Sequence, residues 1–168
     1  MSTVAVSSAL DAGPHDIGNA LLGVPEDQWF DRKSARISAR ELANSLIAMA
    51  NADGGWIVVG LHDGHVEGGD GNVKRRNEQM QANIDYCAPP VRARRRLIDC
   101  VRDGGEPDHL LVFEIDPSDV VHTNVRDEAY LRVGDEDRRL SFSQRQVLLF
   151  DKGQASYEVR PLPAADRS

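Results

Sequence analysis

The sequence predicts an α+β fold in which helices pack on a mixed sheet, and three features carry this prediction. Ser38 and Glu41 form a capping box ahead of apolar residues at helical spacing, which predicts a helix that ends within residues 51–55. The continuous apolar run at 56–61, WIVVGL, has the length of a strand and predicts a central strand covered on both faces. The segments at 91–101 and 109–116 flank a glycine-containing turn, so they predict neighbouring strands joined as a hairpin.

The other elements lie within one domain expected at residues 15–160, between loose tails at 1–14 and 161–168. Turn residues and hydrophobic spacing predict these elements. In chain order they are a short helix at 16–23, a strand at 28–33 with Trp29 facing inward, a glycine-rich turn at 62–72, a helix at 74–87 stopped by Pro89 and Pro90, a strand at 129–134, a helix from Ser141 through Phe150 and a last strand, SYEVR, at 156–160.

The composition is that of a soluble globular protein and excludes several classes. The chain has 168 residues, of which 40% are apolar and 28% charged, and its net charge is −7. No apolar run is long enough to span a bilayer, and the N-terminus lacks the features of a secretory signal, so we expect a cytoplasmic protein without a membrane partner. Cys87 and Cys100 form no CxxC pair, which excludes a structural zinc site of the usual kind and predicts free thiols.

Charge is distributed unevenly along the chain. Residues 1–31 contain five acidic residues and no Lys or Arg, whereas residues 72–102 contain eight basic and three acidic residues. If 91–98 is a strand, Arg92, Arg94 and Arg96 share one face and could contact phosphate groups. The alternative is a solvated edge strand that charge protects from aggregation. The basic residues that we expect to contact nucleic acid are Lys33, Arg36, Lys74, Arg75, Arg76, Arg92, Arg94, Arg96, Arg132 and Arg138.

Acidic residues form the second set of candidates. Glu26 and Asp31 lie close together ahead of the first strand, and Asp63 follows the central strand at a glycine turn. Carboxylate oxygens are the ligands that Mg²⁺ and Mn²⁺ prefer. The alternatives are solvated acids for the pair and a turn-capping role for Asp63. The histidines at 62, 65 and 122 have no metal-binding spacing, so we expect exposed turn residues.

Taken in order, three segments resemble the Schlafen AlbA-like domain family. They are EDQWFDRKS at 26–34, LIAMANADGGWIVVGLHDG at 46–64 and EAYLRVGDEDRRLS at 128–141. The resemblance covers roughly residues 26–150 and implies an Alb-like α+β fold and a link to nucleic acid. In some eukaryotic members the domain is an endonuclease that cuts tRNA and rRNA with three carboxylates and a divalent metal ion, and these carboxylates correspond to Glu26, Asp31 and Asp63.

The chain departs from the family pattern in several ways. Asp31 stands where Glu is usual, Arg32 replaces an aromatic residue and His62 replaces an acidic one. The nuclease members carry two such lobes, whereas this chain has one; a homodimer could supply the second.

Three functions follow as hypotheses. The first is a nuclease acting on RNA such as tRNA, or on DNA, in which Glu26, Asp31 and Asp63 hold Mg²⁺ or Mn²⁺ and Lys33 stabilises charge at the phosphate. The second is a DNA- or RNA-binding regulatory module without catalysis, which depends on the arginine row. The third is a nucleotide-binding protein in which the backbone of 54–55 or 68–71 holds phosphate, although no Walker lysine is present.

Overall fold

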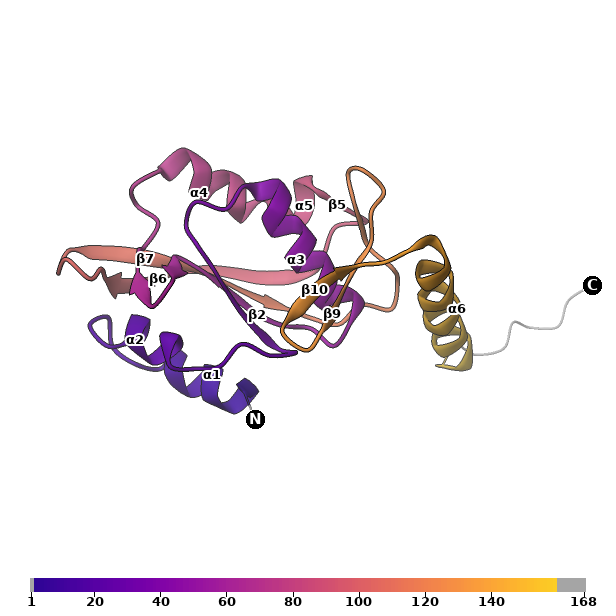
Figure 1. Cartoon of the computed structure of the whole chain (residues 1–168), viewed down its shortest axis with the longest axis horizontal. Helices are drawn as coiled ribbons and strands as arrows, with labels where there is room; N and C mark the ends of the chain where they lie inside the picture. Colours follow the sequence, from indigo (N-terminus) through magenta and orange to yellow (C-terminus); the bar gives the residue numbers. More distant parts are fainter. Residues whose placement is uncertain (1, 160–168) are drawn as a thin grey trace, which may run out of the picture.

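The computed structural model describes residues 2–159, with the side chains of residues 3–153, and its centre is a four-stranded mixed sheet (Figure 1). The strand order is β1-β2-β7-β6. The strands are β1 (Phe30–Lys33), β2 (Gly55–Val59), β7 (Pro107–Ile115) and β6 (Ala93–Val101). The β1–β2 pair is parallel and the other two pairs are antiparallel. The α+β class is therefore confirmed, and the apolar run at 56–61 does supply a central strand.

Helices cover both faces of this sheet (Figure 1). One face carries α1 (Ser2–Leu10) and α2 (Ile17–Leu22), and the other carries α3 (Ala39–Asn51), α4 (Val73–Met80) and α5 (Ala82–Asp85). The capping box behaves as expected, because the Ser38 hydroxyl accepts a hydrogen bond from the Glu41 N–H at 3.1 Å. Since helices cover both faces of the sheet, apolar residues are needed on both faces of β2, and this explains the continuous apolar run in the sequence.

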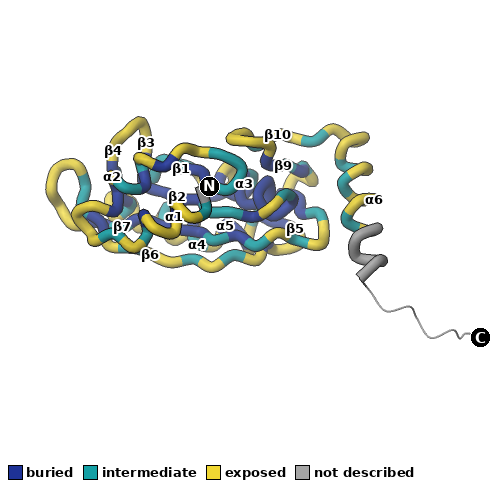
Figure 2. The backbone as a smooth tube through the Cα atoms, turned by 90° about the horizontal axis from the view of Figure 1, so that it is seen from below, coloured by how far each residue is buried: buried dark blue, intermediate teal, exposed yellow. Residues whose placement is uncertain are grey.

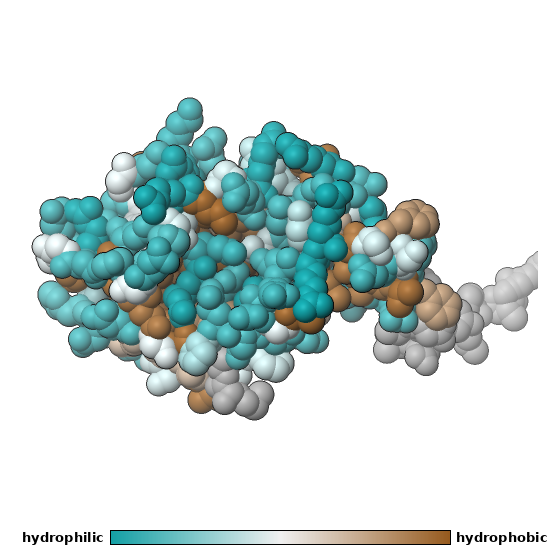
Figure 3. All heavy atoms as spheres, viewed as in Figure 1, coloured by the Kyte–Doolittle hydropathy of each residue, from teal (hydrophilic) through white to brown (hydrophobic). Residues whose placement is uncertain are grey.

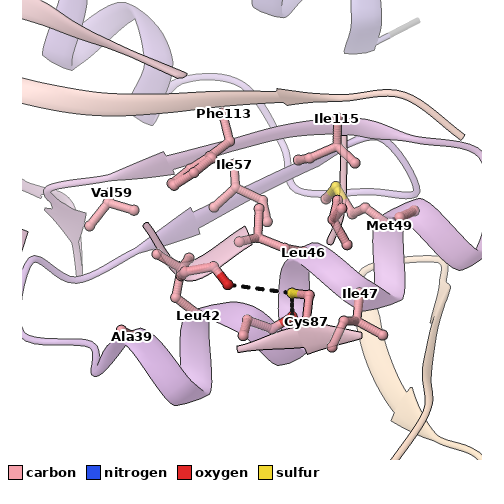
Figure 4. Close-up of a cluster of buried hydrophobic side chains, with 14 of the residues drawn as sticks. Ala39, Leu42, Leu46, Ile47, Met49, Ile57, Val59, Cys87, Phe113 and Ile115 are labelled. Carbon is pink, nitrogen blue, oxygen red and sulfur yellow. Dashed lines mark hydrogen bonds between the residues drawn. The ribbon is translucent and has the colours of Figure 1, made fainter. Parts of the chain in front are cut away.

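Two hydrophobic cores result, one on each side of the sheet. Ile57 and Val59 face the core under α3, whereas Val58 between them faces the core over α1 and α2. Figure 4 shows the first core, where α3 side chains such as Leu46 meet the sheet. Cys87 lies in this core as a free thiol, and burial raises its pKa to about 12. Cys100, also a free thiol, lies in the second core.

Three short antiparallel strand pairs and one long helix complete the described chain. The pairs are β3 (Leu61–His62) with β4 (His65–Val66), β5 (Cys87–Ala88) with β8 (Thr123–Asn124), and β9 (Tyr130–Val133) with β10 (Glu136–Arg139). The helix α6 (Phe142–Val159) leads away from the sheet and its helices (Figures 1 and 2), and Phe142 and Phe150 on it are exposed, with apolar side chains visible there in Figure 3. No helix within residues 2–159 is long and apolar enough to cross a membrane.

Three expectations about local structure were wrong, and one strand was missed. Residues 2–10 form α1 instead of a loose tail, because Val6 and Ala9 are buried in the second core. The first strand begins at Phe30, so Phe30 faces inward and Trp29 is only half-buried. Residues 156–159 belong to α6 and not to a strand, while 160–168 lie outside the described residues. The hairpin strand β10 was not predicted.

Candidate functional site

The strand β1 places its adjacent residues Phe30 and Asp31 on opposite faces of the sheet. Phe30 faces the core over α1 and α2, and Asp31 therefore faces the opposite side, where it is buried with 4% of its surface exposed. The Asp31 carboxylate lies 3.1 Å from the Lys33 Nζ and 3.3 Å from the Arg132 Nη1. Two cations thus compensate a carboxylate that would otherwise be costly to bury.

Arg132 lies inside the protein, which corrects its predicted role as a nucleic-acid contact. Its side chain is 1% exposed. The guanidinium donates to the backbone carbonyls of Asp27 and Phe30 at 2.9–3.1 Å, as well as pairing with Asp31. It also donates to Asp137 Oδ1 at 2.9 Å. With its donors engaged in this way, Arg132 joins β9 to β1 and cannot reach a phosphate.

Asp137 and Ser45 extend this group, which we call the buried cluster: Asp31, Lys33, Ser45, Arg132 and Asp137. The Ser45 hydroxyl on α3 donates to Asp137 Oδ2 at 2.6 Å, and Lys33 lies 3.9 Å from the same oxygen. The buried cluster therefore ties α3, β1 and the β9–β10 hairpin together. Sequence reasoning missed Ser45 and Asp137, because neither lies in a pattern that signals a site.

Glu26 and Asp31 interact as a carboxyl pair at the edge of the buried cluster. Burial, followed by the hydrogen bond with Glu26, raises the pKa of Asp31 to about 6. Burial would also raise the pKa of Glu26, but hydrogen bonds with Asp31 and the Arg32 N–H outweigh it and lower that pKa. The pair therefore holds one proton at a pH where separate carboxylates would have lost theirs.

Asp63 lies apart from this pair on the turn between β3 and β4. Its side chain is 80% exposed and lies 3.1 Å from the His62 Nε2. Among the described residues, Glu26, Asp31 and Asp63 do not form a group whose ligand atoms approach within 4.8 Å of one another. Because Asp31 is also paired with two cations, the three carboxylates do not fit a common metal ion in this arrangement.

Possible ligand atoms do lie within 4.8 Å of one another in a different group, which consists of Asp70, Asp108 and His109. Asp108 Oδ1 accepts hydrogen bonds from the N–H groups of Gly69, Asp70 and His109. Asp70 pairs with Arg76 and with His109. The oxygens and nitrogens of the group are already used within the protein, so its role is to hold the loop at 67–72 against β7.

The motif residue Asn51 also has a structural role. Its side chain accepts from the His122 N–H at 2.8 Å and donates to the carbonyls of His122 and Tyr130 at 3.1 and 2.9 Å. Gly54 and Gly55, which follow, have positive φ, and a Cβ on either would lie 2.5 Å from a backbone oxygen. The Gly54 N–H already donates to the Met49 carbonyl at 2.8 Å and Gly55 belongs to β2, so 54–55 is unsuitable for holding a phosphate.

The three motif segments thus contact one another. Asn51 of the second segment binds Tyr130 of the third, and Arg132 of the third binds Asp31 of the first.

His122, expected to be exposed, is buried; its Nδ1 lies 2.7 Å from the Pro89 carbonyl, and burial lowers its pKa. His62 and His65 are exposed, as expected.

The arginine row on β6 is at the surface. Arg94 and Arg96 lie on β6, an edge strand of the sheet, and Arg92 immediately precedes it; all three are exposed. Arg94 pairs with Glu114 at 3.0 Å and with Asp116 at 3.5 Å. Within the part of the chain that the structure describes, the guanidinium groups of Arg92 and Arg96 have no ion-pair or hydrogen-bond partner.

The remaining basic candidates differ in how accessible they are. Lys74 is exposed, and Arg36 and Arg138 have side chains 72% and 60% exposed. Arg75 is half-buried beside a surface cavity. Arg76 is an exception, because its side chain is 14% exposed and bound to Asp70, so it is a poor phosphate contact.

Comparisons with known proteins agree with this fold. No curated protein matches the chain. The crystal structure of the DIP2311 protein from Corynebacterium diphtheriae is similar, with a TM-score of 0.52 and 17% sequence identity. The similarity covers 82% of this chain and 29% of the DIP2311 chain, so this chain spans less than a third of the length of DIP2311. The family model described as Schlafen, AlbA_2 matches residues 26–141. Because this match covers most of the chain and all three motif segments, the chain belongs to the Schlafen AlbA_2 family.

Proposed function

We propose that the protein binds the phosphate backbone of nucleic acid through the arginine row on β6. Membership of the Schlafen AlbA_2 family indicates a function related to nucleic acid. The observation that supports this surface is that Arg96 on the edge strand β6 and Arg92 just before it are exposed and that, among the described residues, their guanidinium groups have no partner. Charged donors of this kind are the usual contacts to phosphate oxygens.

The overall charge of −7 limits how strong such binding becomes. Glu114 and Asp116 also neutralise Arg94, the middle residue of the row. We therefore expect sequence-independent binding with a Kd of about 10⁻⁶–10⁻⁴ M that weakens as salt is added.

The test measures fluorescence anisotropy of labelled tRNA, single-stranded RNA and DNA at several salt concentrations. Each lost phosphate contact reduces the slope of log K against log salt by about 0.7 for single strands and 0.9 for duplexes. The double variant Arg92→Ala/Arg96→Ala should thus flatten the slope by roughly 1.4–1.8. The control is Arg139→Ala on β10, an exposed arginine paired with Glu128. A double variant with the wild-type slope would refute the proposed surface.

A metal-dependent nuclease is the second candidate, and the carboxyl pair of Glu26 and Asp31 is the observation that favours it. A shared Mg²⁺ or Mn²⁺ would require Asp63 to approach this pair, so we assign no catalytic step to the three residues. Cleavage of labelled tRNA with Mg²⁺, Mn²⁺ or EDTA tests the candidate. Asp63→Asn is a clean variant, because Asp63 is exposed with φ +49°, a conformation that Asn tolerates. Metal-dependent cleavage that this variant abolishes would support the nuclease, and absence of cleavage would reject it.

A homodimer also stays a prediction. The apolar side chains exposed on α6, including Phe142, Val147 and Phe150, would be the first surface to examine. Light scattering of the purified chain over a range of concentrations measures the oligomeric state, and a constant monomer mass would reject the dimer.

A further inference from the structure

A cavity of about 360 Å³ opens between the loop after β1, the loop at 67–72, the start of α4 and the end of β6. Arg36, Arg75 and Arg102 line it from three different elements, and Glu67 is the one acidic residue in the lining. Three positive charges therefore face one negative charge in a protein whose net charge is −7. Its volume is within the range of small-ligand sites, about 300–1,000 Å³.

Two other cavities of similar size lack this excess of positive charge. One, of about 310 Å³, is lined by Arg40 and Arg126 but also by Glu41 and Glu128. Another, of about 350 Å³, has Arg92 against Asp116 and Asp119 in its lining. The excess of positive charge in the lining of the cavity beside Arg75 is thus not shared by these two cavities.

The walls of the cavity are held by carboxylates that are already satisfied. Glu67 Oε1 accepts from the Ala35 N–H at 2.9 Å and from the Ser34 hydroxyl at 3.0 Å. Asp108 accepts from the N–H groups of Gly69 and Asp70, so these amides cannot hold phosphate as the nucleotide hypothesis required. Any anion in the cavity would depend on the arginine side chains.

The arginines differ in how strongly the protein engages them. Arg102 pairs with Glu106 and lies 3.6 Å from Asp108, and Arg36 lies 3.6 Å from Glu67 with its side chain 72% exposed. No group among the described residues pairs with the Arg75 guanidinium. Arg75 also lies in the first turn of α4, whose N-cap residue Asn72 lines the cavity, so the positive end of the helix adds to the potential.

We propose that this cavity binds a phosphate monoester, with Arg75 as its principal contact. A monoester carries close to two negative charges at neutral pH, so it interacts more strongly with the unpaired Arg75 guanidinium and the positive end of α4 than a backbone diester, which carries one. The ligand would be a free nucleotide or the terminal phosphate of a nucleic acid. This site is separate from the arginine row and does not depend on the function proposed for it.

Isothermal titration calorimetry tests the proposal with adenosine 5′-monophosphate, adenosine, and short oligonucleotides with and without a 5′-phosphate. We expect adenosine 5′-monophosphate or the phosphorylated oligonucleotide to bind more tightly than its counterpart without phosphate. Tighter binding of the oligonucleotide would identify a nucleic-acid end as the source, and equal or tighter binding of the nucleotide would identify a free nucleotide.

Variants locate the site. Arg75→Ala should weaken phosphate-dependent binding about tenfold to a hundredfold, the loss expected for one charge-assisted contact. The control Arg139→Ala should leave it unchanged, and the urea midpoint of Arg75→Ala should match the wild type. Binding should also weaken below about pH 6, where the monoester loses its second charge. Equal affinity for ligands with and without phosphate, or unaltered binding by Arg75→Ala, would overturn the proposal.

Discussion

Arg132 and Arg75 carry the same guanidinium group in two contrasting surroundings. Arg132 is 1% exposed and donates to two carboxylates and two backbone carbonyls, whereas Arg75 borders a cavity and its guanidinium has no partner among the described residues. Arg132 joins β9 to β1, whereas the Arg75 guanidinium stays available to bind a ligand. The contrast shows that partner groups, and not residue type, separate arginines that hold the fold from those that can bind a ligand.

The largest expected effect comes from breaking the buried cluster. Arg132→Met leaves the carboxylates of Asp31 and Asp137 without the more buried of their two shared cations, so we expect the free energy of unfolding to fall by about 3–5 kcal/mol. Urea denaturation measures this. Arg138→Met, on the same hairpin but 60% exposed, should change it by less than about 0.5 kcal/mol. Equal effects of the two variants would remove the distinction between buried and surface arginines.

A second prediction concerns the wall of the cavity. Gly68 has φ +67°, and a Cβ there would lie 2.1 Å from the Asp108 side chain, so Gly68→Ala should cost about 1–3 kcal/mol of stability. At Gly71 a Cβ would meet nothing within 4 Å, so Gly71→Ala should have little effect on stability. Thermal unfolding of both variants compares them, and an intact Tm for Gly68→Ala would show that the loop is not held as described.

The pH dependence of stability sharpens the account of the buried cluster. The folded-state pKa of Asp31, about 6, lies above its ordinary value of 3.8, so the folded protein binds the proton more tightly than the unfolded chain. The contribution of Asp31 to stability therefore falls as pH rises from about 4 to about 6, by roughly 1–3 kcal/mol. To isolate this contribution of Asp31, the free energy of unfolding is measured for wild type and Asp31→Asn from about pH 4 to about pH 6, and the two are subtracted at each pH.

Asp127 provides a control of opposite sign. The hydrogen bond from Arg145 lowers the pKa of this exposed carboxylate, so its contribution is present above the unfolded-state pKa and is lost as pH falls. Asp127→Asn should thus shift the pH dependence in the reverse direction to Asp31→Asn. The same direction for both variants would contradict the raised pKa of Asp31.

Local signals were enough to predict much of the fold. The capping box at Ser38 and the apolar run at 56–61 depend on neighbours in sequence, and both predictions were confirmed. The helix α1 was missed because its segment, STVAVSSAL, gains stability from Val6 and Ala9 packing in the second core and not from intrinsic preference.

The candidate sites were harder to predict because they depend on contacts between distant residues. Nothing in the strand YLRV indicates that Arg132 is buried, since this follows from Asp31, which lies 101 positions earlier. Arg102 was not singled out, because it reaches the cavity only when the end of β6 meets the loop at 67–72. The exposure of the arginine row could be predicted, since alternation along one strand determines it.

The most direct test of the contrast between buried and available arginines is a titration of ¹⁵N-labelled protein with short single-stranded RNA, followed by NMR. We expect the largest amide shifts at residues 92–96, at the start of β6, with the amides of Asp31, Ser45 and Asp137 in the buried cluster unmoved. Shifts concentrated at Asp31 and its neighbours, with β6 unchanged, would contradict this assignment and place the nucleic-acid contact at the carboxylates.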